Sequence, residues 1–356
     1  MENPWYRLVI DPERAVITSL FDKSLGREWV DPNAGWKLGE FIYEQLDNRE
    51  QMEAFRLDNY TREAPEEVWL EALEEGDVWT TLRFRGNTPA AIRNGGYSFE
   101  IRLFNTAKRI DLAYAIDKKL VTEPEGIYIA FPFALENGQL AFDVPGGEVR
   151  AGIDQIPGSS NDWNTVQTYA RLYNGQAQIV LSSVEIPLMQ FGGINTGRYQ
   201  AGASPESTHI YGWPMNNYWT TNFNADQHGG HTWLYSLTSR QGNSIQETTR
   251  FGWGHRTPFL SRVLPGGGMD DANHQGEYLS GWPENIVLIS AMPGQDGQSA
   301  VFHVRETGGT TCTFRLENSI HEKPLQIVEV DVTGHPVPGG SLEMKSLESK
   351  FFRVSY

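Results

Sequence analysis

Glycine and proline, the residues that most often interrupt regular structure, recur along the whole chain and divide it into short apolar segments. The 356 residues include 36 glycines and 19 prolines, and aromatic residues make up 12% of the total. Short segments separated by tight turns suit β-strands better than helices, which need longer uninterrupted runs. The sequence therefore predicts an all-β protein.

The first residues show this pattern clearly. Apolar residues alternate over residues 5–10, a turn follows with Pro12 at its second position, and residues 16–21 run back. This arrangement predicts a β-hairpin. Further segments of strand length occur at 79–84, 99–104, 110–116, 127–133, 179–181, 232–237, 286–290, 300–304, 325–330 and 351–354.

Helix signals are few. The best one covers residues 40–55, whose apolar residues fall at roughly helical spacing: Phe41, Ile42, Leu46, Met52 and Phe55. Residues 66–75 fit either a short acidic helix or an edge strand that carries Val68, Leu70 and Ala72. Periodicity does not decide between these two interpretations.

The chain changes composition near residue 262, where a segment rich in glycine loses apolar periodicity. We therefore predict a large domain at residues 1–264, a linking loop at 265–281 and a smaller domain at 282–356. The large domain has too many candidate strands for one open sheet, so we expect stacked sheets. The smaller domain is expected to be an antiparallel β-sandwich.

Charge and cysteine content exclude several classes of function. The formal net charge is −16, which would repel nucleic-acid phosphates and anionic membranes. Cys312 is the single cysteine, so neither an intrachain disulfide nor a cysteine-based zinc site can form. The sequence shows no signal peptide and no apolar run of membrane-spanning length. We expect a cytoplasmic protein with no nucleic-acid or membrane partner.

Polar and aromatic side chains are densest at residues 211–231, which include Trp213 and Trp219 beside several asparagines. Such sets bind sugars, because aromatic faces cover the C–H patches of a pyranose while amides bond its hydroxyl groups. A structural interpretation is equally open. In that case the aromatic residues belong to the core and the asparagines cap turns.

No catalytic or metal site is predicted from the residues themselves. His228 and His231 are separated by two glycines, and no third metal ligand is identifiable nearby. Acidic residues are numerous, but no pair stands out as the two carboxyl groups that sugar hydrolysis needs. A G-x-S-x-G nucleophile motif is also missing from the sequence.

Several segments, read in order, resemble the C-terminal β-rich region of glycoside hydrolase family 38, the α-mannosidases and their bacterial relatives. The blocks that carry this resemblance are residues 3–31, 125–135, 157–172, 185–194, 213–230 and 302–309. Each block alone is a weak motif, but together they extend over nearly the whole chain. The resemblance implies a large galactose-mutarotase-like supersandwich followed by a smaller β-sandwich.

The resemblance also implies what this chain lacks. Family 38 enzymes carry an α/β barrel that holds zinc through an H-x-D pair and an aspartate nucleophile, whereas this sequence contains no H-x-D triplet. We therefore expect the chain to be inactive alone. Its expected partners are a mannoside-like carbohydrate and a family 38 catalytic barrel, with the zinc held in that barrel and no cofactor in this chain.

In the family, the β region contributes residues to the rim of the sugar site. The polar side chains in the most family-like blocks are chosen as carbohydrate-binding candidates: Tyr128, Asn216, Asn217, Trp219 and Gln227. Tyr128 has a further argument, because alternation over 127–133 leaves it on the face opposite the apolar residues. A tyrosine packed between sheets is the alternative.

Two other functions remain open. A free-standing sugar epimerase would use His228 with Glu247 or Asp226 as acid and base. A purely structural or protein-binding sandwich would bury Trp213 and Trp219 in its core.

Overall fold

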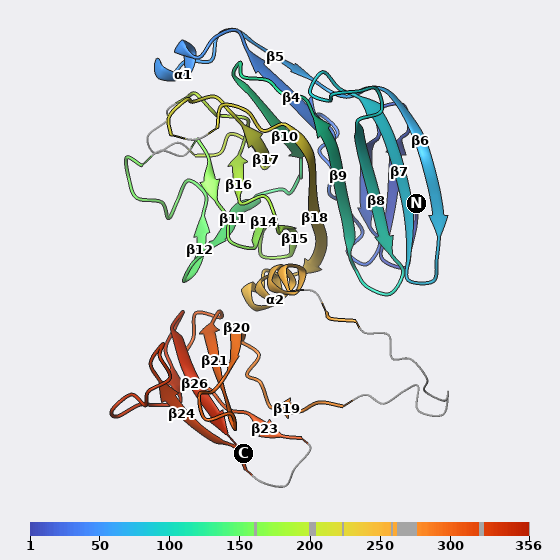
Figure 1. The fold of residues 1–356 in the computed structure, drawn as a ribbon. Coiled ribbons are helices and arrows are strands. Elements are labelled where there is room, and N and C mark those ends of the chain that lie inside the picture. Colours follow the sequence, from blue (N-terminus) through green and yellow to red (C-terminus); the bar gives the residue numbers. More distant parts are fainter. Residues whose placement is uncertain are drawn as a thin grey trace. The chain divides into compact units, whose positions relative to one another are not determined.

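The computed structural model describes residues 1–159, 162–198, 204–222, 224–257, 259–261, 276–319 and 324–355, and strands dominate it (Figure 1). The chain divides into two compact units: Met1–Val144 with Glu148–Asn243, and Pro145–Gly147 with Ser244–Tyr356. Most of the linking loop predicted at 265–281 lies outside the described residues, so that boundary stays a prediction.

Three antiparallel sheets build the first unit. The small sheet has the order β1(Tyr6–Asp11)-β2(Val16–Asp22)-β3(Arg27–Glu28). The six-stranded sheet has the order β13(Asn164–Thr165)-β16(Leu188–Phe191)-β17(Ile210–Asn216)-β10(Glu125–Phe131)-β4(Phe41–Leu46)-β5(Tyr60–Glu63). The nine-stranded sheet has the order β12(Gly147–Arg150)-β11(Gln139–Val144)-β14(Tyr169–Tyr173)-β15(Ala177–Ser183)-β18(Gly229–Gln241)-β9(Ile110–Lys118)-β8(Tyr97–Phe104)-β7(Trp79–Asn87)-β6(Glu66–Glu75).

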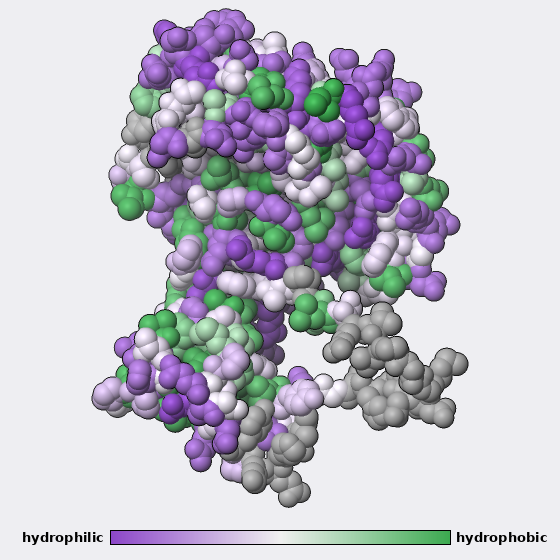
Figure 2. Space-filling model, viewed as in Figure 1, coloured by the Kyte–Doolittle hydropathy of each residue, from purple (hydrophilic) through white to green (hydrophobic). Residues whose placement is uncertain are grey.

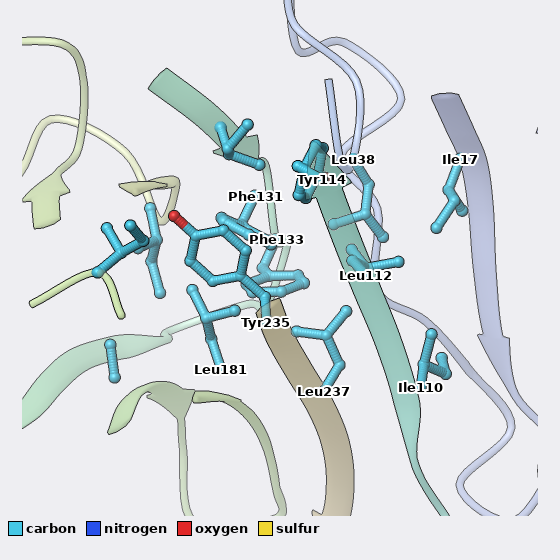
Figure 3. Packing of buried hydrophobic residues seen from close by; sticks show 14 of the residues in the cluster. Ile17, Leu38, Ile110, Leu112, Tyr114, Phe131, Phe133, Leu181, Tyr235 and Leu237 are labelled. Atoms are coloured by element: carbon cyan, nitrogen blue, oxygen red, sulfur yellow. The ribbon is translucent and has the colours of Figure 1, made fainter. Parts of the chain in front are cut away.

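The main hydrophobic core lies between the six-stranded and nine-stranded sheets. Phe131 of β10 contributes to it together with Leu112 of β9 and Leu237 of β18. Figure 3 shows these side chains converging around Tyr235, whose ring centroid lies 4.9 Å from that of Phe131. Burial of this many aromatic and aliphatic side chains is the chief stabilising contribution to the unit.

The helix predicted at 40–55 is wrong for most of its length. Residues Phe41–Leu46 form strand β4, and only Glu50–Glu53 form the short helix α1. The reason is that β4 is buried on both faces: Phe41 and Tyr43 lie in the main core, while Ile42 and Leu46 lie in a second cluster. A strand buried on both faces has no strict alternation, so its apolar residues can fall at helical spacing.

The second unit contains helix α2 (Ile245–Arg256) and a smaller set of sheets. Its four-stranded sheet has the order β20(Ile286–Pro293)-β21(Ser299–Glu306)-β26(Ser349–Ser355)-β24(Gln326–Val330). Two further pairs are β19(Leu279–Ser280) with β23(Glu317–Asn318), and β22(Cys312–Thr313) with β25(Glu343–Met344). Phe302, Phe314 and Phe352 lie in the core of this unit.

The predicted all-β chain, with large stacked sheets followed by a small antiparallel sandwich, is therefore confirmed. The N-terminal hairpin pairs as expected, and residues 66–75 form the edge strand β6. Figure 2 shows mainly hydrophilic residues on the viewed surface of the first unit, with apolar residues scattered among them. Within the described residues, no helix combines the length and apolar character needed to cross a bilayer.

Candidate functional site

The candidate site lies on the face of the six-stranded sheet that points away from the main core. Strand β10 runs between β4 and β17, and its residues alternate between the two faces. Ile127, Ile129 and Phe131 belong to the main core, whereas Tyr128 and Ala130 belong to the second cluster. The expected placement of Tyr128 opposite its apolar neighbours is confirmed.

A bulge in β17 shapes the site beside Tyr128. The register between β10 and β17 shifts between Ile127 and Ile129, so that both Trp213 and Pro214 lie opposite Tyr128. Bulges bend a strand locally and re-aim its side chains. Here Trp213 stacks on Tyr128, with ring planes 1° apart and centroids separated by 5.9 Å.

A row of residues crosses four strands next to this bulge. Asn216 of β17 pairs with Gly126 of β10, which pairs with Glu44 of β4, which pairs with Arg62 of β5. Because Gly126 has no side chain, the ring of Tyr218 passes directly over it. The row therefore collects an amide, a phenol, a carboxylate and a guanidinium group on one face of the sheet.

The side chains of this row form a buried hydrogen-bonded network. Tyr218 donates its hydroxyl to Glu44 Oε1, and Arg62 Nε donates to Glu44 Oε2 in an ion pair. The Tyr128 hydroxyl lies 3.0 Å from Tyr218 Oη and 3.1 Å from Thr196 Oγ1. We call Tyr128, Tyr218, Glu44, Arg62 and Thr196 the phenol–carboxylate network. Such connected networks rigidify a site and fix its geometry.

Burial sets the protonation states in this network. It raises the pKa of Tyr128 and of Tyr218 well above the usual value of a phenol, so both remain protonated at neutral pH and can donate hydrogen bonds. Burial opposes charge on Arg62, but the adjacent Glu44 carboxylate outweighs this effect and raises the pKa of the guanidinium group. The hydroxyl groups of Tyr128 and Tyr218 and the guanidinium group of Arg62 are therefore hydrogen-bond donors arranged around one buried carboxylate, that of Glu44.

Tryptophans connect the network to the surface. Trp213 is only 2% exposed and lies between Tyr128 and Tyr218 in the stacked cluster. Trp219 is half-buried and Trp163 is 36% exposed, and their ring centroids lie 5.5 Å apart. A purely structural role predicts that both Trp213 and Trp219 are buried. Trp213 is buried, but Trp219 is only partly so.

Two buried donors at the site have no hydrogen-bond partner among the described residues. They are the indole Nε1 of Trp213 and the Nη2 of Arg62. Buried polar groups are seldom left unpaired in folded proteins. Each donor therefore calls for an oxygen acceptor, such as a water molecule or the hydroxyl group of a ligand.

The other candidate residues predicted from the sequence have different surroundings. Asn217 is buried and its amide is used by the backbone: Nδ2 donates to the carbonyls of Val121 and Ala225, and Oδ1 accepts the N–H of Glu125 at 2.7 Å. Gln227 is exposed and lies outside the network. The structure thus brings Tyr128, Asn216 and Trp219 to one face, while the sugar-binding role of all five residues stays a prediction.

The residues considered for acid–base or metal chemistry belong to both units. His228 Nδ1 contacts Asp226 Oδ1, but His228 is exposed. Glu247, the other possible partner of His228, lies in the second unit. Within the described residues, no group of three or more histidine, cysteine, aspartate or glutamate side chains is arranged to hold a metal ion.

Glu44 and Arg62 are the site residues that sequence reasoning missed. Glu44 lies on β4, which pairs with β10 about eighty residues away in sequence, and Arg62 lies on β5, which pairs with β4. The available signal was weak: Glu44 is an acidic residue inside the apolar segment 40–55, where a buried charge requires a partner.

Comparisons with known proteins agree on the family. The model of the glycosyl hydrolases family 38 C-terminal domain matches residues 1–185, just over half of the chain. A family 38 glycosyl hydrolase and an α-mannosidase, both from Enterococcus faecalis, superpose with a TM-score of 0.73 at 12% identity over 99% of this chain. The alignments cover 43% and 42% of those two proteins, so this chain spans less than half of their length.

A galactose mutarotase-like protein from Lactobacillus casei matches 67% of this chain and 99% of its own, with 12% identity and a TM-score of 0.40. No curated protein matches the sequence. The chain belongs to the glycosyl hydrolases family 38 C-terminal domain family.

Proposed function

We propose that this chain is a non-catalytic, carbohydrate-associated β region that packs on a family 38 catalytic barrel or completes the sugar site of one. Membership of the C-terminal domain family supports this proposal, as does the fold shared with less than half of two longer proteins. In this proposal the zinc and the nucleophile reside in the barrel. The part of this chain is to hold and orient the sugar.

The observation that carries the proposal is the aromatic and polar surface above β10 and β17. Trp163 and Trp219 present partly exposed rings, and Trp213, which contacts Trp163, has an unpaired indole N–H. Arg62 of the phenol–carboxylate network has a second unpaired donor. Aromatic rings cover the C–H faces of sugars, and hydroxyl oxygens are the acceptors that such donors need. The expected ligand is a mannoside-like carbohydrate.

The geometry assigns different tasks to the tryptophans. Trp213 is buried and fixed by stacking on Tyr128, so it serves as a rigid base. Trp219 and Trp163 retain exposed surface and would contact the sugar ring. The phenol–carboxylate network holds this arrangement in place, which reduces the entropic cost of binding.

Tryptophan fluorescence of the purified chain, titrated with methyl α-D-mannopyranoside, tests the proposal. We expect a saturable change in the millimolar range, which Trp219→Ala and Trp163→Ala should each reduce. Trp69→Ala is the matched control, because Trp69 is an exposed tryptophan on the edge strand β6. A titration without saturable change, or equal loss in the control variant, would contradict a sugar site here.

A further inference from the structure

A second polar depression lies on the other side of the first unit, on the outer face of the nine-stranded sheet. It has a volume of about 330 Å³, at the lower end of the range for small-molecule sites. Its lining residues come from β7, β8, β9 and β18, strands that lie side by side in Figure 1, and from Glu185, which follows β15 (Ala177–Ser183). None of these strands contributes to the phenol–carboxylate network.

Strand register explains why the surface is hollow there. Glu100 of β8, Ala113 of β9 and Leu234 of β18 form one row, and Ser98, Ala115 and Thr232 form the next. The two alanines of β9 are short, whereas the long side chains Glu100 and Leu234 stand on either side. We call this depression the β9 furrow; its residues are Arg83, Ser98, Glu100, Arg102, Asp111, Ala113, Tyr114, Ala115, Glu185, Thr232, Trp233 and Leu234.

One wall of the β9 furrow is held rigid by ion pairs. Arg83 donates from both Nε and Nη2 to Glu100 Oε2, at 2.9 and 2.7 Å, and Arg102 Nη2 donates to Glu100 Oε1 at 2.7 Å. The guanidinium group of Arg102 also lies 4.9 Å from the ring centroid of Trp79. Glu100 is therefore clamped between two arginines, and little side-chain entropy remains to be lost on binding a ligand.

Charge balance decides which class of ligand fits. Arg83 and Arg102 carry one positive charge more than Glu100, and the carboxylate of Glu185, which also lines the furrow, offsets it. Asp111 is paired with Arg109 at 2.6 Å. Because these charges compensate one another, the furrow has no net charge that would attract either an anion or a cation. The guanidinium groups of Arg83 and Arg102 are donors and the carboxylate of Glu100 is an acceptor, so together they can form paired hydrogen bonds with hydroxyl groups. Leu234 and the two alanines offer apolar contact.

We propose that the β9 furrow binds a neutral oligosaccharide, separately from the candidate site on the six-stranded sheet. Glu100, Arg83 and Arg102 would bond the sugar hydroxyls, while Ala113, Ala115 and Leu234 contact its C–H groups. The two sites occupy the outer faces of opposite sheets in the same unit, so a ligand in one does not block the other.

Methyl NMR of the chain labelled at alanine tests this proposal, because alanines report on each site. Ala113 and Ala115 line the furrow, Ala130 lies on the other outer face, and Ala170 is buried in the main core. Titration with methyl α-D-mannopyranoside and with maltotriose should shift the Ala113 and Ala115 signals saturably. Galacturonate, an anionic probe, should shift them less, and Ala170 should not respond.

Variants separate the two sites. Ala113→Leu fills the furrow and should weaken the response at Ala115 by about tenfold or more. Ala107→Leu adds the same atoms to the exposed turn of the same hairpin and should leave that response unchanged. Trp219→Ala should remove shifts at Ala130 only. The proposal is overturned if neither neutral sugar shifts Ala113 and Ala115, or if Ala113→Leu leaves the response at Ala115 intact.

Discussion

The hydroxyl group of Tyr218 occupies the space where a side chain of Gly126 would begin. A Cβ atom added to Gly126 would lie 2.0 Å from Tyr218 Oη and 2.7 Å from its Cζ. The close approach lets one phenol reach across β10 to Glu44 on β4. A glycine within a central strand usually weakens it, so its presence here has a packing reason.

Substituting Gly126→Ala should therefore displace Tyr218 and disrupt the phenol–carboxylate network. We expect a loss of unfolding free energy on the order of 1–3 kcal/mol, the usual cost of overpacking. Gly175→Ala is the matched control, because no atom lies within 4 Å of a Cβ at that position. Urea denaturation compares the two variants, and equal stability would show that the approach of Tyr218 imposes no constraint.

Glu44 is the acceptor on which the network depends. It is 1% exposed, and Arg62 beside it is 17% exposed. Glu44→Gln leaves the guanidinium group without its counter-charge, and removal of one partner from a buried pair costs about 3–5 kcal/mol. Glu53→Gln, at an exposed position on α1, should change stability by less than about 0.5 kcal/mol.

The double variant Glu44→Gln with Arg62→Met checks this explanation. Removing both partners takes away the uncompensated charge, so part of the lost stability should return. If the double variant is less stable than Glu44→Gln alone, the ion pair is not the cause of the loss.

Asp22 should make stability depend on pH. Burial alone would raise the pKa of Asp22, but hydrogen bonds from Lys108, Ser239 and Ser24 together outweigh burial and lower it from 3.8. A lowered pKa in the folded state means that the stabilisation is fully present above pH 3.8 and is lost as the pH falls through the folded-state value.

The variant Asp22→Asn tests whether the Asp22 charge causes this loss of stability at low pH. At neutral pH it should be less stable than the parent by on the order of 2 kcal/mol, because it loses the charge that faces Lys108. The difference should stay constant down to about pH 4 and should narrow as the pH falls below this, through the lowered pKa of Asp22. Urea denaturation over this range measures it, with the exposed Asp77→Asn as control. A difference that stays constant below about pH 4 as well would contradict the proposed role of the Asp22 charge.

Much of the fold could be predicted from the sequence, because alternation and turns are local signals. The hairpin around Pro12 and the face occupied by Tyr128 are both present in the structure. Strand β4 was mistaken for a helix because both of its faces are buried. Helix α2 was missed although Ser244 and Glu247 form an S-x-x-E capping pattern, in which Ser244 Oγ accepts the N–H of Glu247.

The candidate site was harder to predict, because its geometry depends on pairing between distant segments. Tyr218 lies next to predicted candidates, but its partner Glu44 is 174 residues away in sequence. Asn217 is of a residue type that often binds sugars, yet its side-chain amide is hydrogen-bonded to the backbone of Val121, Glu125 and Ala225. Residue type indicates which side chains could bind a sugar, whereas strand register determines which side chains lie next to one another.

We propose that this chain supports a sugar site without hydrolysing glycosides itself. The most direct test is the rate at which the purified full chain, supplied with zinc, releases nitrophenol from p-nitrophenyl α-D-mannopyranoside. We expect a rate equal to that of buffer with zinc. The proposal would be contradicted if the chain hydrolysed the substrate faster than buffer and if Glu44→Gln or Asp226→Asn removed this activity while retaining the fold.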